Sequence, residues 1–482
     1  MGSMQTKSEP AATPGDSQKE TLQLLGLPLP FWAVIVVLCV AACHLVYGLW
    51  FWTHSPTNAP KTSLSLKGDA FLESFPGWNT DNERDAASFN RTAMEVLRTG
   101  VPRTRAGAFY DHAPAYSYFL AACYAVGGVR LLSVVIPQAV LSGLTGLLVA
   151  LAAYRLAPRW RVLSAVGAAL LMLVDVRVAA CVGSMNNPTP LLLPLHALAF
   201  YLATGPEKAG RIGLLVLVVV LAMYTTASYF LVGGAAALWL LWRFARTRGV
   251  AQLAGAAVIL GSMAVKLLLV ELPGESLRED DKATFWYGNN PYYESMSVWD
   301  LWAVRQDPTW TPWLKWRATD SEKTRYNEYL RRAGNDVRKA GWLWARENPG
   351  HYAKMCLVRL RATLGPVTGH MRLTLNKLIS TGLWLLVFPA GFWGLWQARR
   401  TAPGQLAWLI VFAVCGFETM VFAGLQLRYR LPVDLMLAAF AAVTYAGWFD
   451  RIVRKSTPEP QRAGGPEAAA TVISPDRNEF TE

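Results

Sequence analysis

The sequence predicts an all-α polytopic membrane protein, and three observations support this fold class. Hydrophobic residues make up 53% of the 482 residues and charged residues only 16%, whereas a soluble domain has roughly 25% charged residues. Apolar runs of the length that spans a bilayer recur along the chain. Short basic clusters separate these runs. The high apolar content also excludes a disordered or fibrous protein.

Ten apolar runs are the predicted membrane crossings, since a helix needs roughly 20 residues to span the hydrocarbon. One precedes a polar segment, six lie within 131–270 and three within 378–450. Another run, 114–128, is too short to cross and is predicted to be an interfacial helix. Of these predictions, the division of 210–243 into two helices has the weakest support in the sequence. The ten runs are 30–52, 131–155, 160–181, 187–203, 210–227, 228–243, 249–270, 378–397, 405–425 and 431–449.

Basic residues set the predicted orientation, because they gather in cytoplasmic loops. With ten crossings, all five short basic clusters fall on one side, which we assign to the cytoplasm together with both termini. The segments 53–130 and 271–377 then face outward, and the tails 1–29 and 451–482 are predicted to be disordered cytoplasmic segments. The clusters contain Arg155, Arg159 and Arg161; Lys208 and Arg211; Arg243, Arg246 and Arg248; Arg399 and Arg400; and Arg451, Arg454 and Lys455.

The net charge of +13 is interpreted as attraction to anionic membrane lipids, not to nucleic acid. Frequent Ala, Arg, Leu and Trp favour a bacterial inner membrane over an endoplasmic reticulum membrane. The six cysteines show no metal-binding spacing and are predicted to be small buried hydrophobic residues.

The first outward loop contains a predicted helix from Asp85 to Gly100. Apolar residues Phe89, Ala93, Val96 and Leu97 follow a helical spacing, and Gly100 is a natural C-terminal stop. Asp85 therefore lies at the start of an amphipathic helix. One interpretation is an acid that offsets the helix dipole, and the other is a functional carboxylate.

Four motifs occur in an order that resembles a known family. They are Asp85-Ala86-Ala87-Ser88-Phe89, His112-Ala113-Pro114-Ala115-Tyr116, Asn348-Pro349-Gly350-His351-Tyr352 and Arg428-Tyr429-Arg430-Leu431-Pro432. Together they resemble the GT-C membrane glycosyltransferases, in particular the protein O-mannosyltransferase-like branch that includes the lipid A aminoarabinose transferases. Seven predicted crossings precede the second outward domain, as in that family. The resemblance implies a GT-C-type helical bundle.

The resemblance also implies a reaction. A sugar would move, with inversion, from a polyprenyl-phosphate donor to a glycan, lipid or protein acceptor on the outward side. Asp85 would serve as general base or as partner of a metal. A carboxylate within reach of an acceptor hydroxyl removes its proton as the new bond forms.

Cationic residues near the outward ends of the predicted crossings are candidates for binding the donor phosphate, because guanidinium and ammonium groups suit phosphate oxygens. Snorkelling interface anchors are the alternative. Glu418 lies inside a predicted crossing and is expected to pair with Arg428 or Arg430. The phosphate-binding candidates are Arg428, Arg430 and Lys266, and the supporting candidates are Glu83, Tyr110, His112, Glu418 and Asn187.

A divalent metal is disfavoured, although the cofactor is left open. The family often has a second acid near the start of the span at 187–203, and the segment Gly183–Pro190 contains none. Asp175 could substitute, but a local ion pair with Arg177 is the preferred interpretation. His196, in the middle of a predicted span, is expected to be a packing residue more often than a proton relay.

Two other functions share these features. A transporter or flippase of a lipid-linked substrate would need the buried charges but not two large outward domains. A non-catalytic membrane assembly subunit would use Asp85 only as a helix-terminal acid. Asn90-Arg91-Thr92 also fits a glycosylation sequon, which matters only if the outward side is an endoplasmic reticulum lumen.

Overall fold

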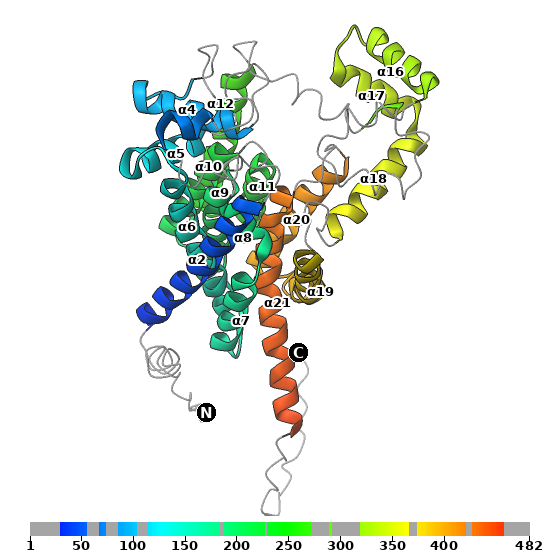
Figure 1. The fold of residues 1–482 in the computed structure, drawn as a ribbon. Coiled ribbons are helices and arrows are strands. Elements are labelled where there is room, and N and C mark those ends of the chain that lie inside the picture. Colours follow the sequence, from blue (N-terminus) through cyan, green and yellow to red (C-terminus); the bar gives the residue numbers. More distant parts are fainter. Residues whose placement is uncertain are drawn as a thin grey trace, which may run out of the picture.

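The structure, a computed structural model, describes residues 29–54, 67–73, 85–103, 114–183, 188–226, 229–271, 289–291, 319–365, 374–420 and 427–456. All regular elements of these residues are helices, which confirms the predicted all-α class for this part of the chain (Figure 1). The predicted tails fall outside the described residues, except that the last helix continues to Ser456.

Each of the ten predicted apolar runs contains a helix. The run 160–181 is broken into two, and 210–243 forms two helices, as predicted. In chain order the helices are α2 (Leu29–His54), α6 (Leu131–Leu156), α7 (Arg161–Leu173), α8 (Val176–Val182), α9 (Thr189–Ala203), α10 (Ala209–Thr225), α11 (Phe230–Thr247), α12 (Val250–Glu271), α19 (Thr374–Gln397), α20 (Ala402–Met420) and α21 (Leu427–Ser456).

Within the described ranges, four helices are long and apolar enough to cross a membrane: Phe31–Trp50, Leu131–Leu156, Leu378–Gln397 and Arg430–Val453. The pair α7 and α8, bent by 56° at the break, would make a fifth. Several other apolar helices are shorter. The chain is thus an integral membrane protein by the length and composition of its helices, and the number of ten crossings stays a prediction.

Helix α2 has the exposed apolar surface that is expected of a helix facing lipid. Its apolar side chains are largely exposed, for example Leu38 at 62% and Val46 at 69%. Cys39 and Cys43 are exposed on the same helix. The prediction that the cysteines are buried is therefore wrong for these two, because apolar residues of an outer helix face lipid and not a protein core.

The first outward segment contains α3 (Gly68–Glu73), α4 (Asp85–Thr99) and α5 (Pro114–Gly127). Phe89 and Ala93 of α4 are fully buried, but Leu97 is 41% exposed, so the predicted apolar face ends before the last turn. The helix stops at Gly100, as predicted. Its φ of +76° is one that glycine adopts without strain, and its N–H donates to the carbonyl of Val96 at 2.8 Å.

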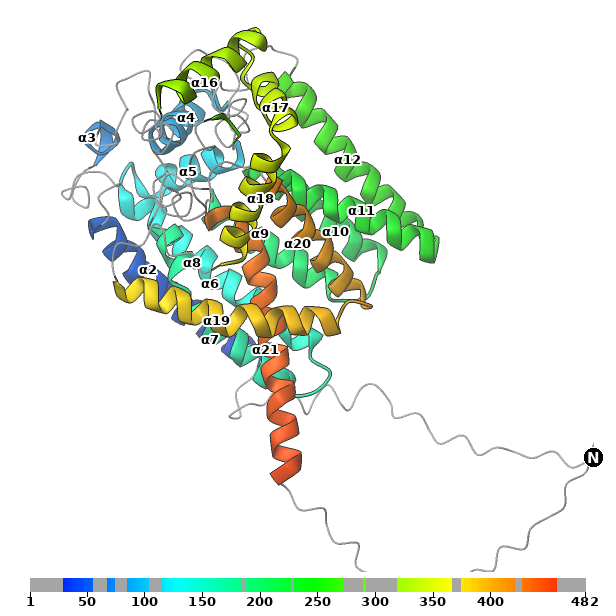
Figure 2. The same cartoon turned by 90° about the vertical axis from the view of Figure 1, so that its right-hand side faces the viewer.

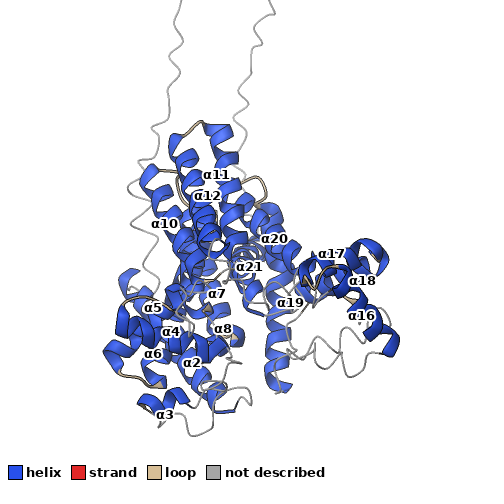
Figure 3. Cartoon of the chain, turned by 90° about the horizontal axis from the view of Figure 1, so that it is seen from above, coloured by secondary structure: helices blue, strands red, loops and turns tan. Residues whose placement is uncertain are grey.

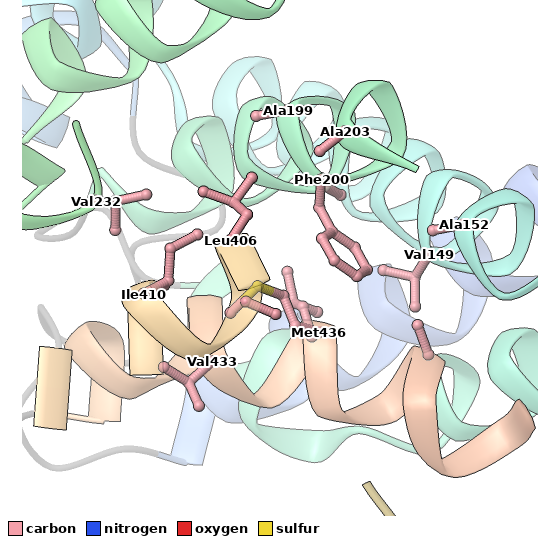
Figure 4. Close-up of a cluster of buried hydrophobic side chains, with 14 of the residues drawn as sticks. Val149, Ala152, Ala199, Phe200, Ala203, Val232, Leu406, Ile410, Val433 and Met436 are labelled. Atoms are coloured by element: carbon pink, nitrogen blue, oxygen red, sulfur yellow. The ribbon is translucent and has the colours of Figure 1, made fainter. Parts of the chain in front are cut away.

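The largest core surrounds α21. Phe200 of α9 and Met436 of α21 point into it beside Val149 of α6 and Leu406 of α20 (Figure 4). Helix α19 crosses α21 (Figure 2). A β-carbon at Gly394 of α19 would lie 2.6 Å from the carbonyl oxygen of Phe440, so glycine is needed for this close crossing.

The described part of the second outward segment consists of α16 (Asp320–Arg332), α17 (Val337–Glu347) and α18 (Pro349–Leu364). Helices α16 and α17 stand apart from the bundle, and α18 leads back to it (Figures 1 and 3). Thr319 begins α16 with a capping box to Glu322. A small core around Tyr329 and Trp344 holds α16 against α17.

Candidate functional site

Four buried charged side chains from two distant segments form one network, here called the charge quartet: Asp175, Arg177, Arg430 and Asp434. Arg177 donates to both carboxylate oxygens of Asp175, with Nε–Oδ1 of 2.9 Å and Nη2–Oδ2 of 2.7 Å. Its Nη1 donates to Oδ2 of Asp434 at 2.6 Å. The Nε of Arg430 lies 3.1 Å from both oxygens of Asp434. The quartet is electrically neutral and no member is more than 8% exposed.

The quartet lies at the break between α7 and α8. Asp175 is the N-cap of α8, and its carboxylate accepts from the backbone N–H of Arg177 at 3.0 Å. The break frees carbonyl groups of α7, and the carbonyl of Met172 lies 3.0 Å from His44 Nε2 of α2. His44 Nδ1 lies 2.5 Å from the hydroxyl of Ser142. Side chains thus satisfy backbone groups that a broken span exposes.

Arg430 joins the quartet to the end of α18. Its Nη1 donates to the carbonyl of Thr363 at 2.7 Å and to that of Gly365. Its Nη2 is buried and has no hydrogen-bond partner among the residues that the structure describes. The predicted ion pair between Asp175 and Arg177 is present. Arg430, a proposed partner of Glu418, has Asp434 as its ion-pair partner.

Lys266 lies on α12, against α10 and α11. Its Nζ donates to the carbonyl of Met223 at 2.6 Å and stands 4.8 Å from the centre of the Phe230 ring and 5.6 Å from that of Tyr224. The side chain is 4% exposed. A carbonyl oxygen and two aromatic rings thus contact the ammonium group.

The first two sequence motifs meet in space. Phe89 of α4 contacts Tyr116 of α5 edge to face, with ring centres 5.2 Å apart. Gln138 of α6 donates to the Tyr116 hydroxyl at 2.9 Å. Tyr124 of α5 donates to the side-chain oxygen of Asn90. This packing fixes α4, whose first residue is Asp85, against the end of α6. The sequon Asn90 is fully buried, so the folded protein offers no access to it for glycosylation.

The third motif holds the outward helices together. Asn348 Nδ2 donates to the Tyr329 hydroxyl at 3.1 Å and to the Trp344 carbonyl at 3.0 Å. The Tyr352 hydroxyl donates to the carbonyl of Met420 at 3.1 Å, which connects α18 to α20. Beside this motif, Glu347 accepts hydrogen bonds from Arg332, and this contact lowers the pKa of the Glu347 carboxyl.

Several predicted site residues cannot be placed. Glu83, Tyr110, His112 and Asn187 lie outside the described residues, and so do the side chains of Asp85, Glu418 and Arg428. Among the residues that the structure describes, no three His, Cys, Asp or Glu side chains are grouped so that they could hold a metal ion. His196 Nδ1 lies 2.8 Å from the hydroxyl of Tyr229, a contact that fits the packing interpretation.

Two polar residues of this region were missed by the sequence analysis. Asp434 follows Arg430 by four residues inside an apolar run. That spacing puts both on one helix face, and an acid within a span was itself a signal. His44 had no signal, because its partners Ser142 and Met172 lie 98 and 128 residues away.

Comparisons with known proteins find a family that is similar to part of this chain. Residues 111–269 match the family described as dolichyl-phosphate-mannose-protein mannosyltransferase. No curated protein matches the chain. Three solved structures are similar at low sequence identity. The archaeal oligosaccharyltransferase AglB from Archaeoglobus fulgidus, in complex with an inhibitory peptide and a dolichol-phosphate, has 12% identity and a TM-score of 0.46, over 89% of this chain and 52% of that one.

The oligosaccharyltransferase of Archaeoglobus fulgidus in complex with Zn and sulfate has 13% identity and a TM-score of 0.45, over 86% of this chain and 50% of that one. ArnT from Cupriavidus metallidurans in the apo state has 16% identity and a TM-score of 0.35, over 89% and 81%. The chain spans about half the length of the two oligosaccharyltransferases. Over residues 111–269 the chain is similar to the dolichyl-phosphate-mannose-protein mannosyltransferase family, which confirms the resemblance that its motifs predict.

Proposed function

We propose that this protein is an integral-membrane glycosyltransferase that moves a sugar from a polyprenyl-phosphate donor to an acceptor on the extracytoplasmic side. The family match over 111–269 supports the reaction class. The proposal includes ten crossings, both termini in the cytoplasm and a bacterial inner membrane. Helices at all ten predicted runs and the basic clusters on one set of loops support this topology.

The observation that carries the donor site is the unpartnered Nη2 of Arg430. A buried guanidinium N–H without a partner is costly, and such a group usually has a ligand that the protein alone does not supply. The rest of this guanidinium is held by Asp434 and by two carbonyls at the end of α18. Arg430 would thus offer the two N–H groups of Nη2 to donor phosphate oxygens. Arg428, two residues earlier, and Lys266 are the other candidates for this phosphate.

The proposed chemistry needs one base and several cations. The acceptor hydroxyl attacks the anomeric carbon, the bond from that carbon to the phosphate oxygen breaks, and polyprenyl phosphate leaves. The Asp85 carboxylate takes the hydroxyl proton as the new bond forms. The leaving phosphate is already a stable anion, so it needs positive charge and not a strong acid. Asp85 is the first residue of α4, which the Phe89–Tyr116 contact holds in place.

The substitution Asp85→Asn tests the base. Asparagine keeps the size of the side chain and caps a helix about as well as aspartate, but its amide cannot accept the proton. We expect transfer to fall by roughly 10²- to 10⁴-fold, measured with a polyprenyl-phosphate sugar in detergent. Glu83→Gln and Asp81→Asn are matched controls from the same loop.

Three outcomes would count against the proposal. If Asp85→Asn transfers sugar within a few-fold of wild type, Asp85 is only a helix-terminal acid. If Glu83→Gln is the inactive variant, the base is Glu83. If the wild-type protein moves the donor across a vesicle membrane without forming a new glycosidic bond, the protein is a flippase.

A further inference from the structure

A groove on the outside of the bundle has a volume of about 430 Å³ and is lined by α2, α6 and α7, with one residue from α9. Its walls are almost entirely apolar, with Trp32 and Cys39 from α2, Leu147 from α6 and Leu170 from α7 among them. An apolar cavity of about 150 Å³ already holds a benzene molecule, so this groove has room for a substantial apolar chain.

The polar residues of the groove are confined to one end. Helices α6 and α7 run in opposite directions, so Arg155 near the end of α6 and Val162 near the start of α7 line one end, while Leu147 and Leu173 line the other. Arg155 follows Leu147 by eight positions, which corresponds to about 12 Å of helix. The polar end consists of Tyr154, Arg155 and Tyr201.

The cation at this end is held in place but is not neutralised. The central guanidinium carbon of Arg155 lies over the Tyr201 ring, 3.8 Å from its centre. Two further arginines lie nearby: Arg161, 5.8 Å from the centre of the Tyr154 ring, and Arg211, 5.6 Å from the centre of the Tyr201 ring. Within the described part of the chain, no carboxylate forms an ion pair with any of these three arginines. Stacking leaves the edge of a guanidinium free to donate to a planar or tetrahedral anion.

We propose that this groove binds an anionic phospholipid, with one acyl chain along the apolar walls and the phosphate at Arg155. The charge complementarity supports a headgroup with a net negative charge. Arg155 lines the groove, Arg161 and Arg211 lie over the two tyrosine rings at the same end, and none of the three pairs with a carboxylate of the described residues. The arginines belong to the basic loops that we assign to the cytoplasmic side, so the lipid would come from the inner leaflet.

This groove is distinct from the proposed donor site. Arg155 is 24 residues from Leu131 on the same helix, about 36 Å along its axis. Leu131 packs in the cluster that contains Phe89 of α4 and Tyr116 of α5. The proposed headgroup site and the start of α4 therefore lie at opposite ends of α6, and loss of one need not affect the other.

The test uses the purified full-length protein in detergent and native mass spectrometry. We expect phosphatidylglycerol to bind about tenfold more tightly than phosphatidylcholine, because both lipids offer a phosphate to Arg155 but only phosphatidylcholine adds a quaternary ammonium, which the arginines repel. Arg155→Gln should remove this preference, and Ala169→Phe, which fills the groove, should weaken both lipids. Arg400→Gln, an exposed arginine of another basic loop, is the matched control and should bind as wild type.

A second measurement needs no variant. Cys39 lines the groove and Cys43 does not, although both are exposed on α2. Phosphatidylglycerol should slow alkylation of Cys39 by N-ethylmaleimide and leave the rate at Cys43 unchanged.

Four results would overturn the proposal. Equal binding of the two lipids would remove the headgroup site. Competition by inorganic phosphate alone would indicate a simple anion site, and displacement by polyprenyl phosphate at equal or lower concentration would indicate a donor groove. Alkylation of Cys39 that lipid does not change would show that no acyl chain lies there.

Discussion

Arg177 is the side chain whose removal should damage this fold most. It is 4% exposed and donates three side-chain hydrogen bonds, of 2.9, 2.7 and 2.6 Å, to two carboxylates. Arg177→Met would leave Asp175 without its ion pair and Asp434 with Arg430 alone. Breaking a buried pair by removing one partner costs about 3–5 kcal/mol, which is a large fraction of a typical stability of about 5–15 kcal/mol.

The assay is unfolding in mixed micelles with a rising fraction of sodium dodecyl sulfate, followed by tryptophan fluorescence. Arg177→Lys keeps the positive charge but loses the planar guanidinium that donates to two acceptors at once. It should therefore lower the free energy of unfolding by less, about 1.5–3 kcal/mol. Arg159→Met is the control. Arg159 pairs with Asp450 at 3.9 Å while its side chain is 64% exposed, and such surface pairs contribute about 0–1 kcal/mol.

A double variant separates the charge from the packing. Arg177→Met with Asp175→Asn removes the carboxylate that loses its ion pair and keeps the pair of Arg430 with Asp434, so part of the lost stability should return. Coupling between side chains in one network is about 0.5–3 kcal/mol. If Arg177→Met unfolds within about 1 kcal/mol of wild type, or if Arg159→Met is equally damaging, the quartet does not hold this fold together.

Three further predictions concern the donor, the topology and the outward helices. Arg428→Ala should weaken donor binding by about 10- to 100-fold and Arg428→Lys by less, because lysine keeps the charge but not the fork; unchanged affinity would leave Arg428 an interface anchor. A cysteine at Thr247 should resist an impermeant thiol reagent applied from outside and one at Ser321 should react, and the reverse pattern would refute the topology. The pKa of Glu347 is lowered by the hydrogen bond from Arg332, so its contribution to folding is present above the unfolded pKa of the carboxyl and is lost as pH falls through the lower folded value. Thermal unfolding between pH 6 and pH 3 should show this loss in wild type and not in Glu347→Gln.

The features that sequence predicted well depend on local patterns. Apolar runs predicted the helices, because a run of that kind is stable only when its backbone is internally hydrogen-bonded. Gly100 predicted the end of α4 because the left-handed conformation is a local property of glycine. The face of α4 was predicted through Ala93 and failed at Leu97, since no tertiary partner covers the last turn.

The contacts of the candidate site depend on segments far apart in the chain. Arg430 contacts the end of α18, 67 residues earlier, and Arg177 contacts Asp434 across 257 residues. A single sequence carries no pattern at such separations. The motif at Arg428–Pro432 was therefore recognised as a unit, but the sequence did not show that Arg430 is tied to Asp434 and to two carbonyls.

The break between α7 and α8 has a consequence for the order of assembly. During synthesis α2 precedes the break and can supply His44 early, whereas Asp434 arrives only with the last described helix. Until then, Arg177 is opposed by Asp175 alone, and the broken span contains a polar turn that lipid solvates poorly. We therefore expect the bent segment to reach its final position only after α21 is inserted. A ribosome-bound nascent chain that ends before α21 should therefore be cleaved by protease at the α7–α8 break, and the full-length chain should resist.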